Sequence, residues 1–215
     1  NRLIERINIR TWESIGVEGR GQFYDGIGAL RDVGQNHLLQ MLALVTMDRP
    51  GSYSAGDVRQ KRVEILSMLE VLTGEEIKTK TFRGQYRGYK RIADVSKNSQ
   101  TETYFRTYAQ LSHPRWHGVE IMLEAGKRLP LKKEIEIIFK HPSPCLCPIG
   151  KPHFKNRILI NIEPKEGIAI EFWSKKPGLE HTFAQRKFNF VLRRVSDRVQ
   201  YVEEYEKLLL DCISG

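Results

Sequence analysis

The spacing of hydrophobic positions divides the chain into a helical first half and a strand-rich second half. Residues 4–13 have partial period-two character, which predicts a strand, and the glycine-rich residues 14–28 predict a loop. Apolar positions at helical spacing predict helices over residues 27–47 and 57–72. The basic, turn-prone residues 75–99 then predict a long loop.

After residue 101 the sequence becomes typical of β-structure. Six runs combine β-branched and aromatic residues, with turn signals between them: TETYFRTYAQL, WHGVEIMLEAG, EIEIIFK, RILINIEP, IAIEFWS and KFNFVLRRV. Short connections favour antiparallel pairing, and the closing stretch YVEEYEKLLLDCISG predicts a final helix. Helices followed by a block of strands predict an α+β fold, with a large, mostly antiparallel sheet and helices packed on one side of it.

Composition narrows the class of protein. The chain has 215 residues, 40% of them hydrophobic, which suits one domain over residues 1–215. The longest apolar stretch, residues 38–47, is much shorter than the roughly 20 residues that cross a bilayer, and the charged start lacks the apolar part of a secretory signal. Three cysteines, an odd number, do not make a disulfide framework. We therefore expect a cytoplasmic protein with no membrane partner.

A formal charge of +9 predicts a partner that carries phosphate. Charge alone leaves nucleic acid, a nucleotide cofactor and a sugar phosphate open. The basic turn EAGKRLPLKKE, residues 124–134, lies between two expected strands, and its Lys127 and Lys132 are suited to hold a phosphate by point charges. A solvated charged hairpin is the plainer interpretation of the same residues.

Polar residues at the start of the first expected helix are a second candidate. Asp32, Gln35 and Asn36 share one face of an α-helix, and His37 lies about 100° round from Asn36. Such a helix start presents a carboxylate, amides and an imidazole toward one cleft. The residues alone favour a plainer interpretation, in which Asp32 stabilises the first turn and His37 is an ordinary boundary histidine.

Ordered motifs decide between these interpretations. The blocks are EGRGQFYDGIGALRDVGQNHLLQMLALVTMDRP, RGQYRGY, TETY, RWHGVEIMLEAGKRL, NRILINIEPKEGI, KKPG and YEKLLLD. In this order and approximate spacing, the chain resembles glucose-6-phosphate dehydrogenase over nearly its whole length, as the C-terminal, substrate-binding and oligomerising domain. The resemblance implies an oxidoreductase of glucose metabolism. It would convert D-glucose 6-phosphate to 6-phosphoglucono-δ-lactone with reduction of NADP, the first step of the oxidative pentose phosphate pathway.

The resemblance also implies roles for five residues. The catalytic base is expected at His37, because an imidazole that titrates near neutral pH suits removal of the proton from the C1 hydroxyl. Glu13 and Asp32 are expected to bind sugar hydroxyls, and Lys127 and Lys132 to bind the phosphate. A homodimer or homotetramer formed through the sheet is implied as well, with Ile, Phe and Trp expected on both of its faces.

Departures from the family pattern limit what the chain is expected to do by itself. It contains no glycine-rich strand-to-helix turn and no HYLGK segment, so NADP is expected to bind mainly to an N-terminal domain that this chain lacks, with NAD still open. The isolated chain is therefore expected to be inactive. Glu163 replaces a frequent Gln, which leaves a substrate contact there open, and Glu124 replaces an Arg, which argues against a second, structural NADP.

One group of metal-ligand residue types and two rival functions remain. His141, Cys145, Cys147 and His153 include a C-x-C spacing rather than the usual C-x-x-C, so we expect no metal site. A basic nucleic-acid-binding module is allowed by charge, but the basic residues are scattered and no RNA-type aromatic signature is present. A pure assembly module without a competent pocket is the third interpretation, which binding of the sugar phosphate would separate from the enzyme.

Overall fold

The structure is a computed structural model and describes residues 2–141, 143–145, 147, 153–179, 182–191, 209–210 and 212–213. Its helices are α1 (Gly21–Asp25), the π-helix η1 (Leu30–Leu38), α2 (Leu39–Thr46), α3 (Ala55–Leu66), α4 (Gly74–Lys80) and the 3₁₀-helix η2 (Tyr89–Arg91). Its strands are β1 (Ile4–Glu13), β2 (Thr81–Gly84), β3 (Tyr104–Ala109), β4 (Glu120–Lys127), β5 (Lys132–Phe139), β6 (Arg157–Glu163), β7 (Gly167–Lys175) and β8 (Phe183–Val191).

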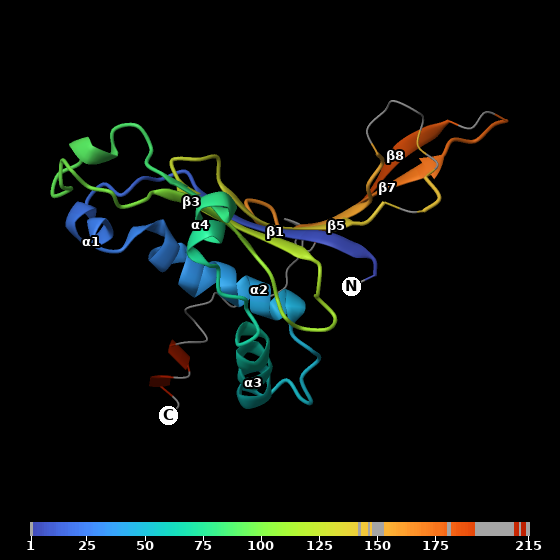
Figure 1. The fold of residues 1–215 in the computed structure, drawn as a ribbon, viewed down its shortest axis with the longest axis horizontal. Coiled ribbons are helices and arrows are strands. Elements are labelled where there is room, and N and C mark those ends of the chain that lie inside the picture. Colours follow the sequence, from blue (N-terminus) through green and yellow to red (C-terminus); the bar gives the residue numbers. More distant parts are fainter. Residues whose placement is uncertain are drawn as a thin grey trace.

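The strands form an eight-stranded sheet in the order β2-β3-β4-β1-β5-β6-β7-β8 (Figure 1). All neighbours are antiparallel except β1 and β4, which run parallel. β1 therefore lies inside the sheet although it comes first in the chain, and the connection from β4 to β5 has to pass around the end of β1. The α+β class, the mostly antiparallel sheet and the six expected strands after residue 101 are confirmed.

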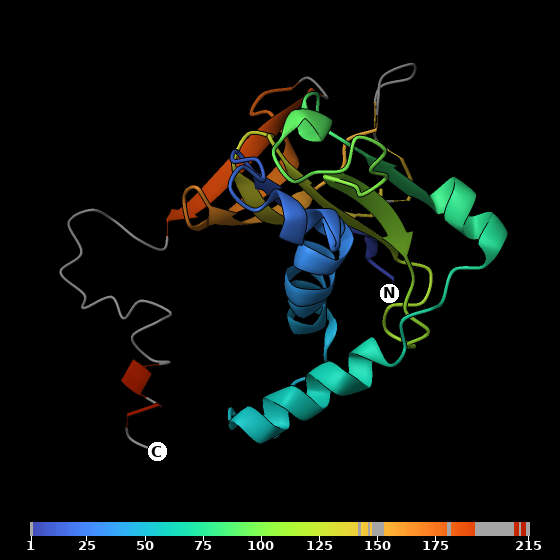
Figure 2. The same cartoon turned by 90° about the vertical axis from the view of Figure 1, so that its left-hand side faces the viewer.

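A hydrophobic core joins one face of the sheet to the helices. Ile7 and Ile9 of β1 are fully buried in one cluster with Val33, Leu38 and Leu42 from η1 and α2. Figure 1 shows the labelled helices on one side of the sheet, and Figure 2 shows α3, in cyan-green, on the far side of α2 from the sheet. The expectation of helices packed on one side is confirmed.

The helix-side face stays apolar beyond the helices. One row of cross-strand neighbours runs from Ile7 through Ile137, Ile158 and Ile170 to Phe188. Exposure rises along this row, from 0% at Ile7 to 40% at Ile170 and 61% at Phe188. In Figure 1 the β7–β8 hairpin extends past the helices. Among the described residues, the apolar surface of β7 and β8 is therefore uncovered.

The opposite face of the sheet carries paired charges. Arg10 bonds to Glu134 at 2.8 Å and to Glu136 at 3.0 Å. Arg157 continues this network, at 3.0 Å from Glu136 and 2.6 Å from Glu171. The expectation of apolar residues on both faces holds only in part: Trp12 and Trp173 lie on this face, but many of the alternate residues of these strands form ion pairs.

The first expected helix is wrong in its first half. Leu30–Leu38 form the π-helix η1, and only Leu39–Thr46 form an α-helix. The loop expected over residues 14–28 also contains the short helix α1. Hydrophobic periodicity assumes 3.6 residues per turn, so it cannot detect the wider turn of a π-helix.

Capping residues shift the next two elements. α3 begins at Ala55 because Ser54 Oγ accepts a hydrogen bond from the Asp57 amide at 3.2 Å, and it ends at Leu66 rather than at residue 72. The next helix, α4, begins at Gly74, because Thr73 and Glu76 form a reciprocal capping box. The expected loop of residues 75–99 consequently contains α4, β2 and η2.

The expected closing helix lies largely outside the described residues, of which 209–210 and 212–213 are helical. Among the described helices, none is long and apolar enough to cross a membrane.

Candidate active site

The turn between β4 and β5 wraps around the end of β1. Lys127, the last residue of β4, is the register partner of Glu13, the last residue of β1. Two backbone hydrogen bonds fix the turn: the Arg128 amide donates to the Ile15 carbonyl (3.2 Å), and the Leu129 amide donates to the Glu13 carbonyl (3.0 Å). The sheet topology thereby brings a basic turn to an acidic strand end that is 114 positions away in sequence.

Lys127 lies between two carboxylates. Its Nζ atom is 2.6 Å from Glu13 Oε2 and 3.6 Å from Asp32 Oδ2, and the residue is only 4% exposed. The ammonium offsets the repulsion between the two negative charges. The side chains of Glu13 and Asp32 remain partly exposed, so a ligand can reach both. The structure therefore brings together three of the five residues that the sequence singles out.

Tyr24 of α1 packs on Lys127 in the group formed by Lys127, Glu13 and Asp32, which we call the Lys127 cluster. Its side chain is buried, and its ring centroid lies 5.3 Å from Lys127 Nζ, a cation–π distance. The Tyr24 hydroxyl donates to the Glu102 carbonyl at 3.4 Å. Burial raises the pKa of Tyr24 above its ordinary value, and the nearby Asp32 and Glu102 charges add to the rise. The phenol is thus neutral at physiological pH and encloses the ammonium without adding charge.

The π-helix places Asp32 and His37 on successive turns. In an α-helix, five positions correspond to about 500°, which would leave the two side chains roughly 140° apart. In η1 the hydrogen bonds span five positions, as from the Leu39 amide to the Gly34 carbonyl, so residue i+5 lies just over one turn beyond residue i. The α-helical arrangement expected for these residues is therefore wrong, and the wider turn brings His37 toward the side that carries Asp32.

Two residues to which the sequence analysis gave no role hold η1 in place. The Glu102 side chain accepts a hydrogen bond from the Leu30 amide (2.9 Å), and its carbonyl accepts one from the Ala29 amide (3.0 Å). These bonds satisfy donors that a helix start leaves unpaired. Gly34 packs directly on Phe105 of β3, since a Cβ atom there would lie 2.9 Å from the Phe105 ring. Both residues lie in sequence motifs that carry the family resemblance: Glu102 in TETY and Gly34 in RDVGQNH.

Lys132 lies on the other face of the sheet. It is the register partner of Trp12, and successive residues of a strand point to opposite faces, so it shares a face with Trp12 rather than with Glu13. Its Nζ atom is 4.8 Å from the Trp12 ring centroid and 3.5 Å from Glu134 Oε1. The structure does not join Lys132 to the Lys127 cluster, and its phosphate contact stays a prediction.

His37 is exposed on the surface of η1, and its role as a base stays a prediction. Hollows elsewhere on the described surface are lined by other residues; one of about 510 Å³ lies between Leu30, Phe82 and Phe105. Cavity size therefore does not mark the candidate site. The features that distinguish it are the ammonium that Glu13 and Asp32 share and the exposed imidazole of His37 on η1.

Both glutamates that depart from the family pattern have charged or polar neighbours. Glu124 accepts a hydrogen bond from the Tyr104 hydroxyl and pairs with Arg10 at 3.2 Å. Burial and that hydrogen bond raise the pKa of Tyr104 to about 12. Glu163 pairs with Lys133 at 2.8 Å. A carboxylate at position 124 repels phosphate, and the absence of a second NADP stays a prediction.

Comparison with known proteins decides the family. The family model described as the glucose-6-phosphate dehydrogenase C-terminal domain matches residues 1–215. The chain belongs to this family. A curated glucose-6-phosphate 1-dehydrogenase from Borreliella burgdorferi is 35% identical over 226 residues, which cover 100% of this chain and 47% of that protein. Glucose-6-phosphate 1-dehydrogenase 1 from Mycobacterium tuberculosis is 41% identical over 170 residues, which cover 78% of this chain and 36% of that protein.

Solved structures of glucose-6-phosphate dehydrogenases share the fold. The enzyme from Mycobacterium avium superimposes with a TM-score of 0.83 at 35% identity, covering 99% of this chain and 44% of that one. A glucose-6-phosphate dehydrogenase in complex with its substrate glucose-6-phosphate superimposes with a TM-score of 0.85 at 30% identity, covering 98% and 44%. The chain thus spans about half the length of its glucose-6-phosphate dehydrogenase relatives, and the family expected from the ordered motifs is confirmed.

Proposed function

We propose that the protein to which this chain belongs is an NADP-dependent glucose-6-phosphate 1-dehydrogenase, which oxidises D-glucose 6-phosphate to 6-phosphoglucono-δ-lactone in the oxidative pentose phosphate pathway. One observation supports this most strongly: in a chain of this family, Lys127 lies between Glu13 and Asp32, beside the π-helix that carries His37. We also propose a cytoplasmic location, in keeping with the free Cys145 and Cys147.

Glu13 and Asp32 are proposed to bind hydroxyl groups of the sugar. Ionised carboxylates only accept hydrogen bonds, so a pair of them favours a ligand with several hydroxyl donors. His37, one turn along η1 from Asp32, is proposed to take the proton of the C1 hydroxyl while the C1 hydrogen leaves as hydride to NADP. A neutral imidazole accepts that proton near neutral pH.

The surroundings of Lys127 bear on its expected phosphate contact. An ammonium that two carboxylates already share has a net negative neighbourhood, which weakens its attraction for a phosphate dianion. Lys127 is therefore proposed to contact the sugar hydroxyls together with Glu13 and Asp32. Lys132 remains the candidate for the phosphate, because the one ion pair that it makes with a described residue, Glu134, is long at 3.5 Å.

NADP is proposed to bind outside the described residues. The common dinucleotide site needs a glycine-rich turn that joins a parallel strand directly to a helix start. Here β1, which belongs to the parallel pair, leads instead into a loop and the five-residue helix α1. The described residues therefore provide the substrate ligands and the base, and the hydride acceptor has to be held by another part of the protein.

Self-association through the sheet is proposed at the uncovered apolar surface of β7 and β8. This surface includes Ile170, Phe172, Phe188 and Phe190, all of them 38% exposed or more. Contiguous apolar surface of this kind is typical of protein–protein contacts. A second copy of the chain that packs there would form a homodimer, and a further pairing would form a homotetramer.

An assay of the full-length protein tests the proposed activity. We expect reduction of NADP that saturates with glucose 6-phosphate and is much weaker with unphosphorylated glucose, measured beside NAD. A folded protein that reduces neither cofactor with glucose 6-phosphate would contradict the proposal. Salt-dependent binding of a random oligonucleotide, unaffected by glucose 6-phosphate, would favour the nucleic-acid module instead, and a folded oligomer that does not bind glucose 6-phosphate would favour the assembly module.

A further inference from the structure

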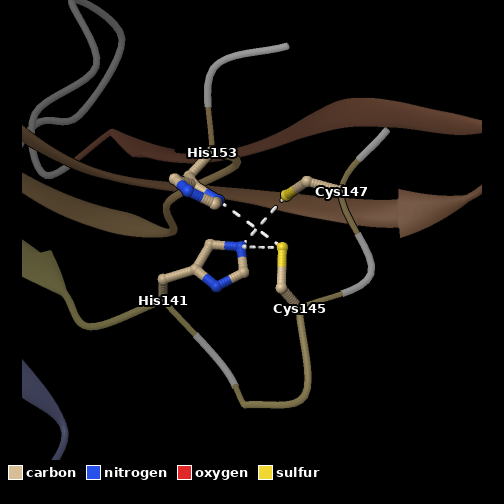
Figure 3. A group of neighbouring side chains, drawn as sticks. All are labelled: His141, Cys145, Cys147 and His153. Atoms are coloured by element: carbon tan, nitrogen blue, oxygen red, sulfur yellow. Dashed lines mark hydrogen bonds between the residues drawn. The ribbon is translucent and has the colours of Figure 1, made fainter. Parts of the chain in front are cut away.

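We propose that the loop between β5 and β6 binds a structural zinc ion through His141, Cys145, Cys147 and His153. Figure 3 shows the four side chains facing one another within this loop. Their ligand atoms all lie within 4.8 Å of one another. This site is separate from the Lys127 cluster, and the inference does not depend on the proposed enzyme activity.

The distances suit a tetrahedral ion. Zn–S bonds of about 2.3 Å and Zn–N bonds of about 2.0–2.1 Å, at tetrahedral angles, put neighbouring ligand atoms roughly 3.3–3.8 Å apart. Cys145 Sγ is 3.5 Å from His153 Nδ1 and 3.9 Å from His141 Nε2. Cys147 Sγ is 3.0 Å from His141 Nε2. Small side-chain shifts are therefore enough to complete the coordination shell.

The donor set selects the metal and its role. Two thiolates and two imidazoles are soft to intermediate ligands, which favour zinc over magnesium or calcium. Two thiolates neutralise a divalent cation, so the bound site would carry no net charge. Four protein ligands fill a tetrahedral shell and leave no position for water or substrate, which is the property of a structural site and not of a catalytic one.

Hydrogen bonds and ring stacking hold part of the loop against the sheet. The Phe139 amide donates to the Asn156 carbonyl at 3.0 Å, which brings the two ends of the loop together. The Phe154 amide donates to Cys147 Sγ at 3.2 Å, a contact that stabilises negative charge on sulfur. The Phe154 ring stacks on Trp173 of β7, with centroids 3.9 Å apart and planes 11° from parallel. These contacts fix the backbone beside two of the ligands, His153 and Cys147.

The loop between β5 and β6 is long, and a bound metal would stabilise its fold. Antiparallel neighbours such as β5 and β6 can be joined by two residues, whereas residues 140–156 exceed the roughly 12–15 residues beyond which connections without secondary structure are uncommon. The described part of this loop contains no helix or strand. A metal that binds only the folded loop stabilises that fold.

This arrangement revises the expectation of no metal. The C-x-x-C rule describes two cysteines on one tight turn, but here the paired strands bring His141 and His153 together from opposite ends of the loop. The spacing between Cys145 and Cys147 is then a weak guide, because the tertiary structure and not the local turn gathers the ligands.

The proposed zinc lies at the opposite end of β5 from the candidate active site. Lys132 begins β5 and His141 follows its end, and a strand of eight residues spans about 26 Å at roughly 3.3 Å per residue. Loss of the metal should therefore loosen the loop without changing the Michaelis constant for glucose 6-phosphate.

Metal analysis of the full-length protein, purified without oxygen from zinc-supplemented cells, tests the proposal. We expect about one zinc per chain. Cys147→Ser and His153→Ala should each lower the zinc content at least about tenfold, because each removes one of four ligands. Cys212→Ser and His117→Ala are the matched controls, since they remove the same residue types outside the cluster, and they should keep the metal.

A second measurement covers the case in which a variant fails to fold. Wild-type protein stripped with a chelator and reconstituted with Co²⁺ should show the intense visible bands of a tetrahedral, thiolate-bound ion. Hydrogen exchange in residues 140–156 should rise on stripping and fall when zinc is restored. The proposal is overturned if wild-type protein contains no zinc and gives no such bands, or if all variants and controls hold equal amounts of zinc. A Cys145–Cys147 disulfide in the oxygen-free preparation would overturn it as well.

Discussion

The covered half of the sheet, β3, β4 and β1, and the uncovered half, β6, β7 and β8, are built from similar strands but present different chemistry. In the covered half, helices bury the apolar row at Ile7, and charged groups on the helix side gather at the strand ends, where Lys127 meets Glu13. In the uncovered half the same row ends at the exposed Phe188. Charged side chains thus gather where a second layer fixes them, and the strands that no described helix covers keep the exposed apolar surface that is proposed to bind a second copy.

The largest expected effect lies in the covered half. His37→Asn in the full-length enzyme should lower turnover by about 10²–10⁴-fold, because loss of a general base removes catalysis of that order. The affinity for glucose 6-phosphate and the oligomeric state should stay near wild type, since Asn keeps the size of the side chain and the uncovered half is untouched.

Steady-state kinetics and calorimetric titration of the sugar phosphate check this prediction. His117→Asn, at an exposed position between β3 and β4, is the matched control and should be nearly silent. Turnover within a factor of about two of wild type would remove His37 from its proposed role.

A second prediction separates the two lysines of the β4–β5 turn. Lys127→Met should lower kcat/KM for glucose 6-phosphate and for unphosphorylated glucose by a similar factor, on the order of 10–100, because a lost hydrogen bond from a charged group costs about 1.5–3 kcal/mol. Lys132→Met should affect mainly the phosphorylated sugar. Kinetics with both sugars give the comparison.

The opposite result would be a smaller ratio of kcat/KM for glucose 6-phosphate to kcat/KM for glucose in Lys127→Met. It would support the phosphate contact that the sequence predicts for Lys127. Lys127→Met should also destabilise the fold, because it leaves Glu13 and Asp32 close together without their shared cation. The cost should be below the roughly 3–5 kcal/mol of a fully buried broken pair, since both carboxylates are partly exposed.

A third prediction concerns the uncovered half. Phe188→Glu should weaken self-association at least tenfold, because it places a charge on the apolar surface that is proposed to be the contact. Asn189→Glu adds the same charge at the next position, on the opposite face of β8, and should leave assembly unchanged. Light scattering over a range of concentrations measures both. Equal assembly of the two variants would place the contact elsewhere.

Local patterns predicted the strands well, because β-branched and aromatic runs between turn signals are a property of neighbouring residues. They could not predict that β1 lies between β4 and β5, since that pairing depends on residues more than a hundred positions away. The start of α4 is readable from Thr73 and Glu76, whose spacing is that of a capping box, although the basic composition of residues 75–99 favours a loop.

The candidate site, like the fold, was predictable from the sequence only in part. Family motifs identified Glu13, Asp32 and Lys127, which the structure joins, but the motifs carried no information on which face of the sheet each lysine occupies. The π-helix could not be read from periodicity, because its start is set by Glu102 and its close approach to β3 by Gly34. The spacing rules that argue against a metal at the Cys and His cluster describe local turns, whereas here the paired strands bring these side chains together.

The smallest expected effect is on the pH dependence of thermal stability, and it comes from Glu136, on the charged face of the strand between the two halves. Burial raises the pKa of Glu136, but hydrogen bonds from Asn8 and Arg10 outweigh burial and hold it below its ordinary value. A carboxyl group whose pKa is lowered by folding stabilises the protein fully above its unfolded pKa, about 4.3, and loses that contribution as pH falls through the folded value. Glu136→Gln should therefore lower the unfolding temperature by a few degrees near pH 7, and the difference from wild type should shrink below about pH 4. Thermal unfolding across this pH range checks the prediction, with the exposed Glu70→Gln as the control. A difference that persists unchanged to pH 3 would show that Glu136 acts through packing and not through its charge.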